Sequence, residues 1–95
     1  MIVFSPDALE DVARLRSFLD QNNLRAAQRA MTLMFTAIER LQDFPDRGRG
    51  TDDPGIRQIV LKFGASGYVV RYAVLPESGD IVITRVWHGR EARPG

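Results

Sequence analysis

The first twenty residues combine a short apolar stretch with a helical pattern, and together they predict one strand and one helix. Residues 1–4 are apolar and β-prone, which predicts a strand that stops at Ser5. Ser5 is a good helix cap and Pro6 fits the first helical position, so a helix is predicted to begin at Pro6. Apolar residues then recur at helical spacing, which predicts one buried stripe and leaves the charged residues, Asp11 among them, pointing away. The stripe consists of Ala8, Val12, Leu15 and Leu19.

A second helical pattern follows the polar cluster at residues 20–23. One Asn of this cluster can end the first helix in the left-handed conformation, and another can cap the second helix. The pattern stops at Phe44-Pro45, because proline makes continuation of a helix costly. Met31 and Met34 are interpreted as core filling, with an adaptable partner surface as the alternative. The second stripe consists of Ala27, Ala30, Met31, Met34, Ala37, Ile38 and Leu41.

The period changes from helical to alternating after residues 45–56, a loop rich in glycine, proline and aspartate. Alternating residues predict strands at 57–63, 68–75 and 81–87, joined by short turns. Short turns require antiparallel neighbours, so these strands form a meander. The order β-α-α-β-β-β predicts one α+β domain over residues 1–95. In it a helical hairpin packs on one face of a mainly antiparallel sheet, and the other face stays partly open.

Composition excludes several classes of protein. The chain is 44% hydrophobic and 26% charged, which is typical of a globular rather than a disordered protein. It has no Cys and one His, so no disulfide, metal site or cofactor is expected. No apolar run is long enough to cross a bilayer, and the N-terminus lacks the basic region of a signal peptide. We therefore expect a cytoplasmic protein with no membrane partner.

The net charge of +1 hides an asymmetry along the chain. Five basic and seven acidic residues precede Arg47, for a net charge of −2, whereas eight basic and five acidic residues follow from Arg47 onward, for +3. The C-terminal half therefore suits an anionic partner better than the helices do. The alternative is that these charges are scattered and solvated.

His88 is the only side chain expected to titrate near neutral pH. It is a conceivable general acid or base, but a single His at the end of a strand is more typical of a structural or interface residue. No carboxylate pair, nucleophilic triad or phosphate-binding glycine loop accompanies it.

The arginines are stronger candidates, because guanidinium groups bind phosphate or carboxylate bidentately. A shared groove would suit nucleic acid or an acidic protein segment, and isolated arginines at the rim are the alternative. They are Arg71, Arg85, Arg90 and Arg93 in the last two strands and the tail, and Arg47, Arg49 and Arg57 in or after the loop.

Several segments, by their order and spacing, resemble the ParE branch of the ParE/RelE toxin superfamily over nearly the whole chain. They are Ser5-Pro6-Asp7-Ala8, Leu41-Gln42-Asp43-Phe44-Pro45, Gly48-Arg49, Ile56-Arg57, Tyr68-Val69-Val70-Arg71-Tyr72 and Val86-Trp87-His88-Gly89-Arg90-Glu91. The resemblance implies a toxin of a toxin-antitoxin module that poisons DNA gyrase. It also implies an antitoxin that wraps a segment along the toxin and folds on binding. We expect the arginine-rich C-terminal part to contact the target, through Arg49, Arg71, Arg85, Trp87, His88, Arg90 and Arg93.

Relatives that resemble RelE are instead ribosome-dependent mRNA endonucleases. In those nucleases an Arg follows the first Tyr of the corresponding strand, whereas this chain has Val69 there and Arg71 two residues further on the same strand face. Lys62 is the only lysine, so the lysine supply of many such nucleases is absent. These differences favour a binding toxin with no catalytic residue, and a non-toxic antitoxin-binding module is a third possibility. A nuclease would use Arg71, Arg85, His88 and Arg90, the histidine for proton transfer and the arginines for phosphate.

Overall fold

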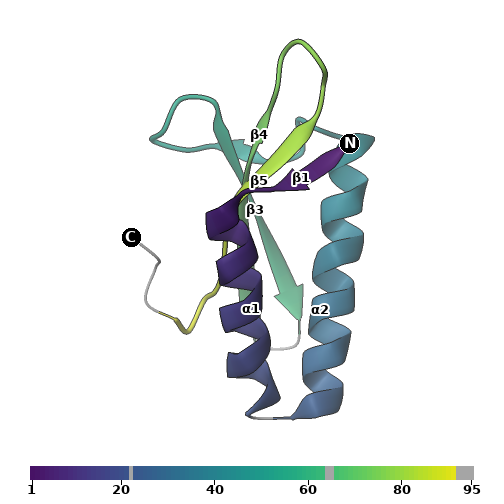
Figure 1. Ribbon diagram of the computed structural model, residues 1–95, viewed down its shortest axis with the longest axis vertical. Coiled ribbons are helices and arrows are strands. Elements are labelled where there is room, and N and C mark those ends of the chain that lie inside the picture. The colour runs from purple at the N-terminus through teal and green to yellow at the C-terminus, as the bar shows by residue number, and fades with distance from the viewer. Residues whose placement is uncertain (22, 64–65, 92–95) are drawn as a thin grey trace.

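In the computed structural model the chain forms two layers, a pair of helices and a five-stranded sheet (Figure 1). The structure describes residues 1–21, 23–63 and 66–91. The α+β class and the predicted order of the main elements are confirmed. The elements are β1 (Ile2–Phe4), α1 (Pro6–Asp20), α2 (Leu24–Glu39), a 3-10 turn η1 (Arg40–Gln42), β2 (Arg49–Gly50), β3 (Ile56–Phe63), β4 (Ser66–Val74) and β5 (Ile81–His88).

Both helices begin at the caps that the sequence predicts. The Ser5 side chain accepts a hydrogen bond from the Ala8 amide at 3.1 Å, with Pro6 in the first turn of α1. The Asn23 side chain accepts one from the Ala26 amide at 3.0 Å at the start of α2. No described residue other than glycine has a positive φ, and Asn22, the other candidate for a left-handed helix end, lies outside the described residues.

The sheet has the strand order β1-β5-β4-β3-β2. The meander β3-β4-β5 is antiparallel as predicted, whereas β1 pairs with β5 in parallel. Between Arg71 and Tyr72 the register of β4 against β5 shifts by one residue, because Arg71 lies opposite Arg85 and Tyr72 opposite Ile83. An extra residue on one strand bends it and strengthens its twist. On β5 the buried positions on the helix side accordingly change from Ile81 and Ile83 to Val86 and His88, while Trp87, also buried, lies on the other face.

One part of the predicted loop is a strand. Arg49 and Gly50 form β2, which pairs with β3 through Gln58 and Arg57. The prediction that all of residues 45–56 are loop is therefore wrong at this point. Two residues carry no alternation that could reveal a strand, and only pairing with β3 defines it.

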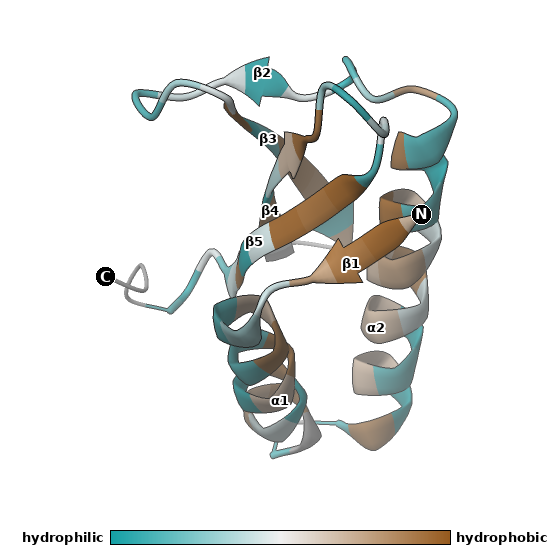
Figure 2. Cartoon of the chain, turned by 45° about the horizontal axis from the view of Figure 1, so that its top comes forward, coloured by the Kyte–Doolittle hydropathy of each residue, from teal (hydrophilic) through white to brown (hydrophobic). Residues whose placement is uncertain are grey.

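Both helices cover the same face of the sheet, and their apolar stripes meet it in one core (Figure 2). Met31 and Met34 are 6% and 1% exposed, which supports their interpretation as core residues. The core takes residues from every main element, including Ala8, Leu15, Ile38, Leu41, Ile59, Leu61, Tyr68, Val70, Tyr72, Ile81, Ile83 and Val86.

Tyr72 fastens the loop before β2 to the core. Its hydroxyl donates a hydrogen bond to the Pro45 carbonyl and accepts one from the Gly48 amide, both at 2.8 Å. A Cβ at Gly48 would lie 2.6 Å from the Tyr72 hydroxyl oxygen, so only glycine fits there. This attachment places Arg47 and Arg49 at the edge of the sheet.

Candidate functional site

The structure distributes the predicted site residues over three places. Arg71 and Trp87 lie on the face of the sheet away from the helices, and Arg49 lies at its β2 edge. Arg85 is turned toward α1. His88 is buried on the helix side, where Arg90 lines a cavity with it. Arg93 lies outside the described residues.

The face away from the helices, which we call the open face, is formed mainly by β3, β4 and β5, and Arg71 is at its centre. The Arg71 Nε donates a hydrogen bond to Gln58 Oε1 at 3.0 Å, and the guanidinium carbon lies 5.3 Å from the centroid of the Trp87 ring. A cation over an aromatic ring is attracted to its face, so Trp87 and Gln58 hold the guanidinium in place. The open face comprises Gln58, Val60, Lys62, Val69, Arg71, Ala73 and Trp87.

A groove of about 530 Å³ runs from the open face to the edge of the sheet. Arg47 and Arg49 line it together with Gln58, the residue that also holds Arg71. We call it the edge groove; Ile59 and Val60 complete its lining. Three guanidinium groups from the loop, β2 and β4 therefore border one continuous surface, which suits negatively charged groups of a partner.

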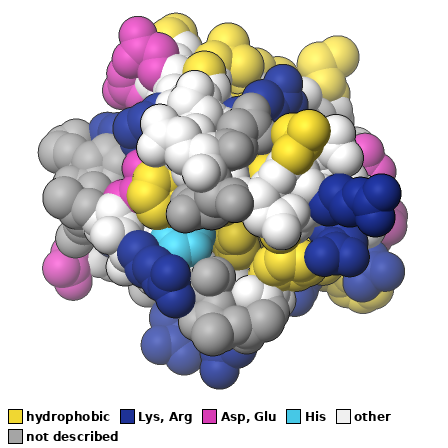
Figure 3. Space-filling model, turned by 90° about the horizontal axis from the view of Figure 1, so that it is seen from below, with side chains coloured by type: hydrophobic (Ala, Val, Ile, Leu, Met, Phe, Trp, Pro, Cys, Tyr) yellow, Lys and Arg dark blue, Asp and Glu magenta, His cyan; other side chains and the backbone are white. Residues whose placement is uncertain are grey.

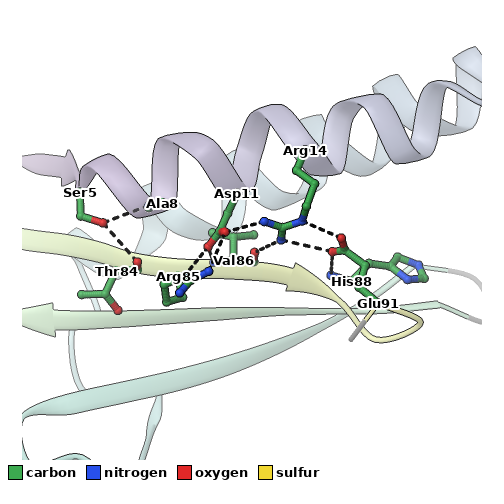
Figure 4. A network of polar contacts seen from close by, with 9 residues as sticks. All are labelled: Ser5, Ala8, Asp11, Arg14, Thr84, Arg85, Val86, His88 and Glu91. Carbon is green, nitrogen blue, oxygen red and sulfur yellow. Dashed lines mark hydrogen bonds and ion pairs between the residues drawn. The ribbon is translucent and has the colours of Figure 1, made fainter. Parts of the chain in front are cut away.

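Arg85 belongs to a different arrangement, a polar network between α1 and the free edge of β5 (Figure 4). Among the described strands, β1 pairs with the first part of β5, and side chains of α1 form hydrogen bonds with the backbone of β5 beyond it. Asp11 accepts a hydrogen bond from the Val86 amide at 2.9 Å, while Arg14 donates to the Val86 carbonyl at 3.2 Å. Asp11 also forms an ion pair with each arginine, at 2.6 Å to Arg14 and 2.8 Å to Arg85.

Asp11 is 1% exposed, so the expectation that it points away from the core is wrong. Burial alone would raise the pKa of its carboxyl, but hydrogen bonds from Arg85, Arg14 and the Val86 amide outweigh burial and hold that pKa below its usual value. Position 11 lies three residues after Ala8 and four before Leu15, so helical spacing could have placed it on the buried stripe.

Glu91 extends the network to the segment after β5. It receives hydrogen bonds from Arg14 Nε and from the His88 amide, both at 2.8 Å. Burial, the largest single influence, would raise the pKa of this carboxyl, but the hydrogen bonds from Arg14 and the His88 amide and the charge of Arg14 together outweigh burial and lower that pKa. The sequence carries no periodicity at this position that could have revealed the contact. The network thus connects α1, β5 and the turn that follows β5.

His88 is 2% exposed and packs between two aromatic rings. Its ring centroid lies 5.4 Å from that of Phe18 and 4.9 Å from that of Tyr68. Burial, and then the charge of Arg90, lower its pKa, so the ring is neutral at physiological pH. Figure 3 shows the His side chain recessed among its neighbours, with a basic side chain beside it. This environment fits a structural or interface residue better than an exposed general acid.

The described part of the chain contains no group of three or more His, Asp and Glu side chains placed to hold a metal ion. None of its helices is long and apolar enough to cross a membrane.

Comparison with known proteins identifies the family. Residues 2–93 match the family model described as ParE toxin of type II toxin-antitoxin system, parDE. Toxin RelE1 of Caulobacter vibrioides is 39% identical over 97% of this chain and 96% of its own length. Toxin RelE3 of the same organism is 35% identical over 97% of both chains. The solved chromosomal ParDE system of P. aeruginosa covers 90% of each chain with a TM-score of 0.68 at 18% identity, which shows the same fold. The chain therefore belongs to the ParE toxin family and is a type II toxin of the ParE/RelE superfamily.

Proposed function

We propose that this toxin acts by binding and poisoning DNA gyrase, without catalysis, and that the open face and the edge groove contact the target. One observation carries the proposal. The residues that a RelE-type nuclease would use occupy three places: Arg71 is on the open face, Arg85 is neutralised by Asp11 on the helix side, and His88 is buried in a cavity that Arg90 also lines. A nuclease needs such groups to converge on one phosphate, with the acid or base within hydrogen-bond reach.

Arg71 is the centre of the proposed contact. Its Nε is used by Gln58, and its two terminal nitrogens make no hydrogen bond with the described residues. A guanidinium held by a ring and an amide loses little conformational entropy when it binds a partner, so its remaining donors are already positioned to bind a carboxylate or phosphate. Arg49 adds charge at the edge, and Trp87 contributes by supporting Arg71.

The family implies a cognate antitoxin, and we propose that it covers α2 and the free edge of β3. β2 pairs only with Arg57 and Gln58, so the remainder of β3 presents an edge that no described strand pairs with. A groove of about 680 Å³ lies beside this edge, where Leu33 and Phe63 are accompanied by Arg25 and Arg29. An acidic segment with apolar side chains, folding on binding, matches this surface.

An assay of DNA supercoiling by gyrase in the presence of the purified toxin tests the proposal directly. We expect inhibition that depends on toxin concentration and weakens by roughly tenfold or more in R71Q, because each hydrogen bond to a charged group contributes about 1.5–3 kcal/mol. R40Q removes the same charge from the exposed end of α2 and is expected to inhibit like the wild type. Full supercoiling at saturating, correctly folded toxin would reject gyrase as the target.

Cleavage of mRNA is a second candidate function, because the Caulobacter relatives are named RelE toxins. In that case His88 would transfer a proton while Arg71, Arg85 and Arg90 hold phosphate, after a rearrangement that exposes the histidine. Primer-extension mapping of translated mRNA distinguishes the two functions, since cuts in the ribosomal A site are expected only of the nuclease. Normal growth of cells that overproduce the folded chain alone would instead indicate a non-toxic antitoxin-binding module.

A further inference from the structure

A cavity of about 450 Å³ lies between the helical hairpin and the adjacent end of the sheet, on the side opposite to the open face. Its walls come from α1, α2, the last residue of β3 and the neighbouring ends of β4 and β5. Phe18 and Phe63 supply apolar surface, and Tyr68, His88 and Arg90 supply polar groups at the sheet end. Gln21 and Asn23 add polar groups where the two helices meet. Its volume falls within the range of roughly 300–1,000 Å³ that is typical of ligand sites. We call it the hairpin cavity.

The three polar side chains at the sheet end of the cavity, Tyr68, His88 and Arg90, are hydrogen-bond donors. The Arg90 amide donates to His88 Nδ1 at 2.9 Å, so the neutral ring carries its proton on Nε2. Burial raises the pKa of Tyr68, although the charge of Arg90 acts in the opposite direction, so the hydroxyl keeps its proton. The Arg90 side chain is always charged and forms no ion pair with the described residues.

Two of these donors are unused. Neither the Tyr68 hydroxyl nor His88 Nε2 has a hydrogen-bond partner among the described residues, although both side chains are only 2% exposed. In that part of the chain no completely buried polar side-chain atom lacks a partner, so both atoms must reach open space. The open space that both residues line is the hairpin cavity. An acceptor placed there would satisfy two buried donors at once.

We propose that the hairpin cavity binds a carboxylate carried by an apolar group. The carboxylate would accept hydrogen bonds from Tyr68 and His88 Nε2 and pair with Arg90, while the apolar group packs between Phe18 and Phe63. The aromatic walls favour an anion that carries an apolar group over a bare inorganic anion, because apolar side chains cannot replace the water that such an anion loses. The same chemistry has two sources, a free small carboxylate or an acidic side chain next to an apolar residue of a protein partner.

An NMR titration of the full chain with N-acetyl-L-phenylalanine tests the site. We expect saturable shifts at Tyr68 and His88, with N-acetyl-L-phenylalanine amide and inorganic phosphate each binding at least about tenfold more weakly. Y68F and R90Q should each weaken binding by roughly 10- to 100-fold, since each removes a donor to a charged group. Y68F removes a hydroxyl that has no hydrogen-bond partner among the described residues, and Arg90 is exposed, so both variants are expected to fold.

R40Q is the matched control and should bind like the wild type, because Arg40 lies at the end of α2, outside the cavity lining. Equal binding of the amide or of phosphate, or unchanged binding in folded R90Q, would overturn the proposal. The peptide N-acetyl-Glu-Phe-amide separates the two sources. Tighter binding of this peptide than of N-acetyl-L-phenylalanine identifies the acidic side chain of a protein as the natural occupant. The reverse order identifies a free carboxylate.

Discussion

Replacing Asp11 with Asn should destabilise the toxin more than any other single charge removal in α1. The carboxylate is 1% exposed and accepts hydrogen bonds from Arg14, Arg85 and the Val86 amide. Asn keeps one acceptor but presents an NH2 group to donors, which removes the Asp11 counter-charge from Arg85 and leaves Arg14 with the carboxylate of Glu91. Breaking a buried ion pair costs about 3–5 kcal/mol, and we expect about 2–4 kcal/mol here because both arginines retain access to solvent.

Urea denaturation followed by circular dichroism measures this loss, and a thermal scan should show the Tm falling by roughly 10–20 °C. E10Q, the neighbouring exposed carboxylate, is the control and should change the free energy of unfolding by less than about 0.5 kcal/mol.

The pKa of Asp11 is lowered in the folded chain, so its contribution is complete above the unfolded pKa of about 3.9 and is lost as the pH falls through the folded value. The difference between wild type and D11N should therefore shrink below about pH 4. A D11N variant as stable as E10Q at pH 7 would refute the role assigned to the network.

Three further variants test other parts of the fold. G48A should lower the free energy of unfolding by about 1–3 kcal/mol, because the added Cβ would clash with the Tyr72 hydroxyl and the Gln58 carbonyl. Urea titration measures this free energy, and an unchanged value would contradict the close approach of Tyr72 to Gly48. Y72F should cost about 1–3 kcal/mol in the same assay by leaving the Gly48 amide unpaired. Because the pKa of His88 is lowered in the folded chain, the unfolded chain binds a proton at this residue at a higher pH than the folded chain does. The free energy of unfolding should therefore decrease as the pH falls below about 6.5, and H88Q should lose this dependence between about pH 5 and 7.5. An imidazole that titrates near about pH 6.5 by NMR would contradict this prediction.

The sequence predicts those parts of the fold that depend on local chemistry. Ser5 and Asn23 start the helices because capping requires only neighbouring residues. The parallel pairing of β1 with β5 joins Ile2 to Ile81, and no local pattern encodes a contact between such distant segments. β2 was not predicted for the same reason, since its two residues form a strand only because they pair with β3.

The candidate site was less predictable, because charge along the sequence does not reveal which charges neutralise one another. Arg71 and Arg85 look equivalent in the sequence, and they lie directly opposite each other on β4 and β5. In the structure Arg71 meets an amide and an indole ring, whereas Arg85 meets a buried carboxylate. The carboxylate comes from Asp11, whose role depends on the position of α1 beside the free edge of β5.

This position of α1 also explains how two cross-strand arginines coexist. Like charges opposite each other on neighbouring strands destabilise a sheet. Asp11 draws the Arg85 guanidinium toward the helix and compensates its charge, so Arg71 can remain on the open face without a nearby uncompensated cation from β5. Asp11 therefore contributes to the proposed target contact as well as to stability. In D11N we expect weaker inhibition of gyrase even at temperatures where the variant is fully folded, because Arg85 then competes with Arg71 for space and for anionic groups. Inhibition by folded D11N equal to that of the wild type would show that the two arginines act independently.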